Sequence, residues 1–284
     1  MKGFAAVLVL VLTDACQPAR ATPVDTLFQD FGLLGSWALN CKAPATRDNP
    51  HVSITAPQPG AVLEEHNLGR DYEVNTDRML SAERVAPLAC SGVTTFGALK
   101  KIPTLEREPT VIIGAGGLGL MCLALHKKMG GHSAVVVDID PAKLDAARKA
   151  GAKAVVDAKA ADAADQIKKL TNGGAWGVVD LVGSSQSARL GYDSLTKGGK
   201  YVIVGLFGGD ITLSLPPIPM RALTIQGSYV GSVPEMAELM DLVKRTGLPD
   251  VPVATRPLSQ VNAAMDDLRA GKVVGRVVLT PEGV

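Results

Sequence analysis

A glycine-rich segment at residues 110–120, TVIIGAGGLGL, has the spacing that most directly indicates chemistry. Gly114, Gly116 and Gly119 follow the pattern G-x-G-x-x-G, after a short Val/Ile-rich run and before an amphipathic stretch. Gly114 permits a tight strand-to-helix turn, Gly116 lets a pyrophosphate approach the backbone, and Gly119 lets the helix pack closely on the strand. The helix N-terminus offers free amide groups and a positive dipole end to phosphates. The residues predicted to form this dinucleotide-binding turn are Gly114, Gly116, Gly117, Leu118 and Gly119.

An acidic residue completes the pattern. Asp138 follows the apolar run Val135–Val137 and stands nineteen residues after Gly119. A carboxylate there accepts hydrogen bonds from ribose hydroxyls and repels the 2′-phosphate of NADP, so we expect NAD as the coenzyme. Asp140 directly precedes Pro141 and is the better helix cap, which leaves Asp138 free for the ribose. Lys143 is the nearby cation and is placed over the adenine ribose.

Alternating strands and helices must position these residues. The short Val/Ile-rich runs do not alternate with polar residues, which is typical of strands buried on both faces. Strands alternating with helices predict an α/β fold, a Rossmann-type doubly wound parallel sheet with helices on both faces. The predicted strands are Thr110–Ile113, Ala134–Asp138, Ala154–Val156, Val178–Val182, Tyr201–Gly205 and Leu223–Tyr229. The predicted helices are Gly117–Met129, Pro141–Ala150, Ala161–Thr171 and Ser185–Thr196, with a further helix over residues 81–92 capped by Ser81.

The composition narrows the classes of function. Hydrophobic residues make up 46% of the 284 residues and charged residues 20%, which predicts a globular core. The net charge is +1 and aromatic residues are 4%, so we expect no nucleic-acid partner. No apolar run reaches the roughly 18 residues that a membrane span needs, so we expect no membrane partner. Four cysteines in a chain of this length do not indicate a disulfide framework.

The first residues allow two interpretations. Met1–Leu12 contains one lysine followed by an apolar stretch, and the A-x-A pattern Ala19–Ala21 loosely resembles a signal-peptide cleavage site. The alternative is a short buried β-strand, since Val and Leu dominate. We favour the strand and a cytoplasmic location, because the rest of the chain requires an intracellular coenzyme.

From about Ser81 to the C-terminus the chain resembles the medium-chain dehydrogenases/reductases, in particular the zinc-type alcohol dehydrogenases. The resemblance implies a smaller N-terminal catalytic lobe related to GroES, and a last segment that partly returns to it. We therefore expect a shortened or aberrant, partly irregular remnant of that lobe at 1–88, an NAD-binding Rossmann domain at 89–232 and a C-terminal segment at 233–284. The segments that carry the resemblance are APLACSGVTTFGALKK (86–101), VIIGAGGLGL (111–120), VVVDIDPAKLDAARKAGA (135–152), GVVDLVGSS (177–185), GGKYVIVGLFGG (198–209), IQGSYVGS (225–232) and LRAGKVVGRVVL (268–279).

The resemblance also implies roles for individual residues. Cys90 matches a ligand of the catalytic zinc, and Thr94 matches the threonine beside the nicotinamide. A small hydrophobic residue buried in a helix is the alternative interpretation of Cys90. Arg276 matches an arginine that reaches the pyrophosphate, where a guanidinium pairs well with phosphate oxygens. The segments that match the coenzyme-lining turns are Val182 and Gly183 near the adenosine, and Val204, Gly205, Leu206, Tyr229 and Val230 near the nicotinamide.

The residues before 81 depart from the family pattern. The Gly-His-Glu motif that supplies a zinc ligand is absent, and Cys41 and His66 are the remaining candidates to join Cys90. A Cys₂His set with an open position suits a Lewis-acid zinc, but no local spacing supports it. The other histidines, His51, His126 and His132, have no motif and are predicted to lie on the surface. The four cysteines are too dispersed for a structural zinc.

These observations predict an NAD-dependent oxidoreductase that transfers hydride between an alcohol or carbonyl substrate and nicotinamide. Two alternatives remain: an NAD-binding protein with a defective zinc site and little turnover, or a zinc-free reductase of the same superfamily. A homo-oligomer is also expected, through the apolar strand Leu223–Tyr229 at a sheet edge.

Overall fold

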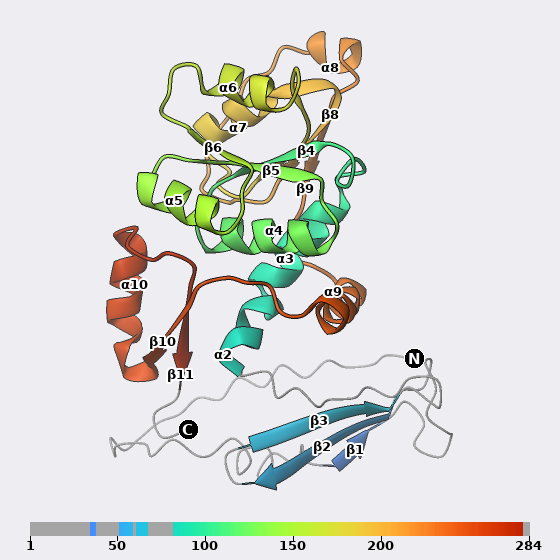
Figure 1. Ribbon diagram of the computed structural model, residues 1–284, viewed down its shortest axis with the longest axis vertical. Coiled ribbons are helices and arrows are strands. Elements are labelled where there is room, and N and C mark those ends of the chain that lie inside the picture. The colour runs from blue at the N-terminus through green and yellow to red at the C-terminus, as the bar shows by residue number, and fades with distance from the viewer. Residues whose placement is uncertain (1–34, 38–50, 59–60, 68–81, 281–284) are drawn as a thin grey trace, which may run out of the picture. The chain divides into compact units, whose positions relative to one another are not determined.

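The computed structural model describes residues 35–37, 51–58, 61–67 and 82–280 (Figure 1). The chain divides into two compact units, Met1–Asp77 with Pro281–Val284, and Arg78–Thr280. The smaller unit contains an antiparallel sheet of β1 (Gly35–Trp37), β2 (His51–Gln58) and β3 (Ala61–Asn67), in that order. Both interpretations of Met1–Leu12 concern residues outside the described ones, as do the predictions for Cys41 and Ser81. The division into three domains stays a prediction.

The larger unit is built on a six-stranded parallel sheet, which confirms the predicted doubly wound α/β fold. The sheet order is β6-β5-β4-β7-β8-β9, so the chain starts in the middle, moves to one edge and then returns to build the other half. In such sheets, ligands bind at the carboxyl ends of the strands where the order reverses, here between β4 and β7. The strands are β4 (Pro109–Ile113), β5 (Ser133–Asp138), β6 (Ala154–Asp157), β7 (Ala175–Asp180), β8 (Leu195–Ile203) and β9 (Thr224–Gly227).

Helices cover both faces of this sheet (Figure 1). One face carries α4 (Gly117–Lys128) and α5 (Pro141–Lys149), and the other carries α6 (Ala163–Leu170) and α7 (Ser185–Asp193). All four helices were predicted from the sequence. The predicted end of the last one at Thr196 is wrong, because Leu195 already pairs with Ala175 in the sheet.

The predicted helix over residues 81–92 is interrupted. The chain forms α2 (Ala82–Val85), the 3₁₀ turn η1 (Ala86–Ala89) and then α3 (Ser91–Lys100). Pro87 lies in the 3₁₀ turn, where its missing N–H and its ring prevent a continuous α-helix. The break places Cys90 at the start of α3, which lies along α4.

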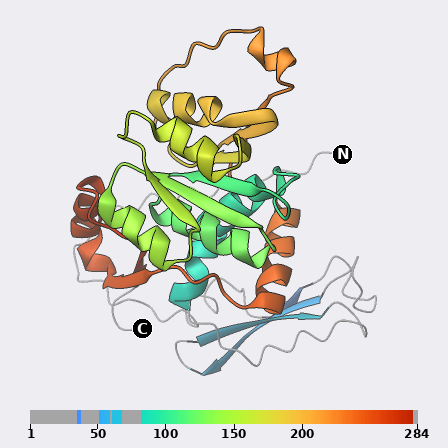
Figure 2. The same ribbon diagram turned by 45° about the horizontal axis from the view of Figure 1, so that its top comes forward.

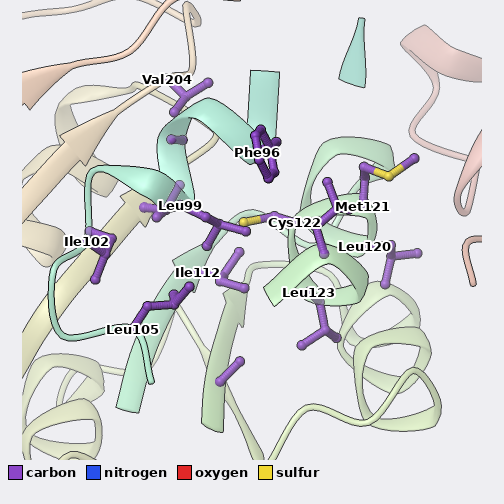
Figure 3. Close-up of a cluster of buried hydrophobic side chains, with 14 of the residues drawn as sticks. Phe96, Leu99, Ile102, Leu105, Ile112, Leu120, Met121, Cys122, Leu123 and Val204 are labelled. Carbon is purple, nitrogen blue, oxygen red and sulfur yellow. The ribbon is translucent and has the colours of Figure 1, made fainter. Parts of the chain in front are cut away.

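Alternate residues of each central strand belong to different core clusters. In β4, Ile112 packs with α3 and α4, whereas Val111 and Ile113 pack with α6 and α7. All three side chains are almost completely buried, as expected for a strand covered on both faces. Figure 3 shows the α3–α4 side of the core, where Leu99 and Cys122 lie beside Ile112, and Phe96 and Leu123 belong to the same cluster.

The remaining elements follow the sheet's fifth strand. Between β8 and β9 the chain makes an excursion that carries the short helix α8 (Pro217–Met220), which stands away from the sheet in Figure 2. After β9 come α9 (Val233–Thr246), β10 (Val253–Pro257), the 3₁₀ turn η2 (Leu258–Gln260), α10 (Val261–Arg269) and β11 (Arg276–Thr280), with β10 and β11 forming a parallel pair. Within the described ranges, no helix is long and apolar enough to cross a bilayer.

Candidate coenzyme-binding site

The glycine-rich turn connects β4 to α4 at the sheet's switch point. Gly114 has a φ of 98°, which favours glycine, and its N–H donates to the Val137 carbonyl at 2.7 Å. A Cβ on Gly119 would overlap the Gly114 carbonyl, so the start of the helix can lie against the turn only without a side chain. Gly116 is different, because a Cβ there would have no heavy atom within 4 Å. Gly114 and Gly119 are therefore required by the backbone of the turn, whereas Gly116 borders open space.

The N-terminus of α4 presents free backbone donors beside this space. Gly116 is the N-cap, and its carbonyl accepts the N–H of Leu120 at 2.9 Å. Within the described part of the chain, the amides of residues 117–119 have no hydrogen-bond acceptor. Such orphan amides at a helix N-terminus form an anion-binding site.

Arg276 lies against the same turn, although it is distant in sequence. A Cβ built on Gly117 would lie 2.6 Å from Cδ and 3.2 Å from an Nη of Arg276. Arg276 begins β11 and is held there by its N–H, which donates to the Pro252 carbonyl at 2.9 Å. The C-terminal segment thus brings a guanidinium beside the free amides.

Asp138 ends β5, the strand next to the turn, and is hydrogen-bonded to the turn. Its Oδ2 accepts the N–H of Ala115 at 2.6 Å, and its Oδ1 accepts the N–H of Asp140 at 3.0 Å. Asp140 accepts the N–H of Ala142 at 2.9 Å, which confirms it as the cap of α5. Since a carboxylate offers about four lone-pair sites, Asp138 retains acceptor capacity for ribose hydroxyls. Lys143, half-buried, follows in the first turn of α5.

Asp180, at the end of β7, organises the other half of the switch point and was missed in the sequence. The residue is 0% exposed, and its Oδ1 accepts the N–H groups of Val182 at 2.9 Å and Gly183 at 3.0 Å. Its Oδ2 accepts the hydroxyl of Tyr201 at 2.6 Å. Burial and the neighbouring Asp180 carboxylate raise the pKa of Tyr201. The signal was available in the sequence, because a lone acid ends an apolar strand three residues before Gly183.

The predicted coenzyme-lining turns after β7 and β8 lie side by side. Gly183 has a φ of 69°, and a Cβ on either Gly183 or Gly205 would overlap backbone of the other turn. The Asp180 carbonyl also accepts the N–H of Val204 at 2.8 Å and of Gly205 at 3.0 Å. The structure therefore brings residues 182–183 and 204–206 together, and Leu206 is left 79% exposed.

The segment after β9 lies against α3. A Cβ on Gly231 would overlap the Val93 side chain, and one on Gly97 would lie 3.6 Å from the Val230 carbonyl. Thr94, in the same helix, is buried, and its N–H donates to the Cys90 carbonyl at 3.0 Å. Tyr229 is 78% exposed. The sequence-predicted residues of α3 and of the β9 turn are thus neighbours.

The described residues do not form a metal site. They contain no group of three or more His, Cys, Asp or Glu side chains that could hold an ion. Cys90 is exposed, so its interpretation as a buried hydrophobic residue is wrong. His66 lies in β3 opposite Val52, in the smaller unit. The residues present in the described ranges therefore do not fit a catalytic zinc, and no chemical step is derived through one.

His126 also corrects a sequence prediction. It was expected on the surface, like His132, but it lies in α4 and is only 1% exposed. The reason is the following turn, where the backbone of Gly131 lies so close to the imidazole ring that a Cβ would overlap it. His132 is exposed, as predicted.

Comparisons with known proteins identify the family of the chain. Residues 117–245 match the family model described as zinc-binding dehydrogenase. The chain is 38% identical over 206 residues to an NAD-dependent alcohol dehydrogenase of Sulfurisphaera tokodaii, covering 72% of this chain and 59% of that one. It is 32% identical over 246 residues to an alcohol dehydrogenase of a Moraxella species, covering 87% of this chain and 70% of that one.

Comparison with solved structures also finds alcohol dehydrogenases. The alcohol dehydrogenase of the hyperthermophilic archaeon Aeropyrum pernix superimposes with a TM-score of 0.65 at 31% identity, covering 78% of this chain and 62% of that one. The chain spans 59% of the length of the Sulfurisphaera protein.

Proposed function

The chain belongs to the zinc-binding alcohol dehydrogenase family, and we propose that it is an NAD-dependent oxidoreductase that transfers hydride between an alcohol or carbonyl substrate and the coenzyme. The observation that carries the proposal is the open space at Gly116, next to the unpaired amides of residues 117–119 and the Arg276 guanidinium. Two kinds of hydrogen-bond donor for phosphate oxygens, backbone amides and a guanidinium, converge there at the positive end of the helix dipole.

The residues around the switch point divide the binding task. We assign the pyrophosphate to the N-terminus of α4 with Arg276, and the adenine ribose to Asp138. Two backbone amides already orient the Asp138 carboxylate, so its remaining lone pairs need no reorganisation to accept ribose hydroxyls. Lys143 and the turn at Val182 and Gly183 complete the adenosine half of the proposed site.

The nicotinamide half is assigned to the turns after β8 and β9, together with Thr94 on α3. Bound NAD supplies the hydride acceptor, and the protein supplies position and electrostatics. The exposed side chains of Leu206 and Tyr229 offer apolar area that can cover a bound ring and exclude water. Val204 and Gly205 contribute backbone held in place by Asp180.

Substituting Gly116 tests the coenzyme assignment. Gly116→Val places a side chain in the open space at a φ of −70°, so the fold should keep its melting temperature. NADH affinity, measured by nicotinamide fluorescence, should fall at least about tenfold, or about 1.4 kcal/mol. Gly227→Val is a matched control, because a Cβ at Gly227 also has no neighbour within 4 Å. Unchanged NADH binding by Gly116→Val would refute the assignment.

Whether zinc takes part is a separate proposal, centred on Cys90. Cys90 would be one ligand, and Cys41 and His66 are the candidates to complete the set. One zinc per chain in atomic emission of the purified protein, lost in Cys90→Ser, would support this ligand set, which the described residues alone do not form. Zinc-free protein that binds NADH but oxidises no primary or secondary alcohol would favour the alternative of an NAD-binding protein with little turnover.

We also propose a cytoplasmic homo-oligomer. Strand β9 lies at the sheet edge and pairs within the described sheet only with β8. Ile225 on this strand is 39% exposed, and the preceding excursion exposes Leu215 and Met220. Open strand edges with apolar side chains pair readily with a second copy. Sedimentation should show a dimer or larger species, and Ile225→Lys should yield the monomer.

A further inference from the structure

A cavity of about 450 Å³ lies away from the proposed coenzyme site, at the opposite end of the strands of the same sheet. It is bordered by the second half of α4 and by the turns that lead into β5 and β6, so it faces the amino ends of these strands. Its volume falls within the range typical of small-molecule sites. The residues that line it are Leu123, His126, Lys127, Gly131, His132, Ser133, Ala134, Gly151 and Lys153.

The ionisable groups of this lining are all basic. Lys127 comes from α4, His132 from the turn before β5, and Lys153 from the turn before β6; no Asp or Glu is among the lining residues. Basic residues in the last turn of a helix commonly complement its dipole, but His132 and Lys153 are not part of the helix. Three separate segments therefore bring basic groups to one cavity.

Part of this lining is held in place. The Lys127 Nζ donates to the Ala150 carbonyl at 3.3 Å, and a Cβ at Gly151 would lie 2.8 Å from the same Nζ. The Lys153 side chain has no hydrogen bond or ion pair within the described part of the chain. One ammonium group is thus positioned, and a second is available for a ligand.

His126 adds a buried polar group to this lining. Its Nε2 is buried and has no hydrogen-bond partner among the described residues. Burial, with a contribution from His132, lowers the pKa of His126 to about 4, so its ring is neutral at pH 7. A neutral imidazole carries one N–H donor, and buried polar atoms of this kind are rarely left unpaired.

We propose that this cavity binds a small oxyanion carrying two or more negative charges, such as a phosphorylated or polycarboxylate metabolite. Lys127 and Lys153 would neutralise the charge, and the His126 ring, which lines the cavity, would donate to one oxygen. The site is distinct from the coenzyme site, because His126 is nine residues after Gly117, or about 14 Å along α4. The inference is independent of the proposed dehydrogenase activity.

Histidine ring signals in NMR spectra provide a local test. Inorganic pyrophosphate and citrate are titrated separately into the full chain, with the His126 and His132 signals assigned from His126→Gln and His132→Gln. Because pyrophosphate can also occupy the α4 N-terminus, each titration is repeated in Gly116→Val. We expect saturable shifts of both signals that persist in that variant. A response to pyrophosphate alone would identify a phosphate ligand, and a response to citrate alone a polycarboxylate.

A second test removes the positive charges of the cavity. Lys127→Gln/Lys153→Gln should weaken anion binding about fivefold, from two exposed ion pairs, whereas Lys168→Gln/Lys169→Gln in the last turn of α6 removes the same charge and should leave binding unchanged. Absence of saturable shifts with either anion would overturn the proposal. Equal weakening by Lys168→Gln/Lys169→Gln would also overturn it, since the effect would then reflect net charge alone.

Discussion

Tyr201→Phe removes a single buried hydroxyl and tests whether Asp180 holds the switch point together. Tyr201 is 2% exposed and Asp180 is 0% exposed, and their oxygen atoms are 2.6 Å apart. A hydrogen bond to a charged group contributes about 1.5–3 kcal/mol, and the substitution leaves one carboxylate oxygen without this donor. The free energy of unfolding should therefore fall by about 2–3 kcal/mol.

Urea unfolding followed by far-UV circular dichroism measures this change. In thermal melts, a unit of this size should lose about 4–12 °C in melting temperature. Tyr192→Phe is a matched control on the same face of the sheet, because the Tyr192 hydroxyl is also buried but has no hydrogen-bond partner among the described residues. Its removal should cost nothing or stabilise the fold. Equal effects of the two substitutions would refute the role assigned to Asp180.

Four further outcomes follow from the same contacts. Because the pKa of Tyr201 is raised in the folded protein, the stabilisation by its hydroxyl is complete below about pH 10, the pKa of tyrosine in the unfolded chain, and is lost progressively at higher pH. The urea midpoints of the wild type and Tyr201→Phe should therefore begin to converge above about pH 10. Because the pKa of His126 is lowered to about 4, the free energy of unfolding should fall as the pH drops from 6.5 to 4. This fall should be about 3 kcal/mol larger in the wild type than in His126→Gln, and His132→Gln should retain it. Asp138→Asn should shift the ratio of NADPH to NADH affinity in favour of NADPH by about tenfold in fluorescence titrations, because it removes the charge that repels the 2′-phosphate. Gly119→Ala should fail to give a stable fold in thermal melts, unlike Gly116→Val, because its Cβ overlaps the Gly114 carbonyl.

The features that the sequence predicted correctly are those that depend on local patterns. The glycine spacing, the Val/Ile-rich strands and the Asp140–Pro141 cap each involve neighbours in the chain, and they define the central sheet and its switch point. The capping box at Ser232, with Glu235 three residues later, was an equally local signal for α9, and it was overlooked. Its Glu235 carboxylate accepts the Ser232 N–H at 2.8 Å, a contact that lowers the pKa of Glu235.

Features that depend on residues distant in sequence could not be derived from spacing. The buried pair of Asp180 and Tyr201 forms only when β7 and β8 align, and nothing near either residue indicates the other. His126 looks like a polar residue at a helix end, and it is buried only because Gly131 allows the next turn to close over its ring. Arg276 was placed through a family resemblance rather than through its own neighbours.

The position of Asp180 explains how a single buried residue can hold two turns of the proposed coenzyme site. One carboxylate fixes the Val182–Gly183 turn through Oδ1, and one carbonyl fixes the Val204–Gly205 turn, so both turns are set by a single buried residue. The Asp138 carboxylate fixes the turn after β4 in the same manner. Two acids at the ends of neighbouring halves of the sheet thus preorganise the backbone that would meet the coenzyme, and neither needs a metal ion for this task. Coenzyme affinity should accordingly respond to Tyr201→Phe, through the turns that Asp180 holds, even though Tyr201 itself is buried beneath them.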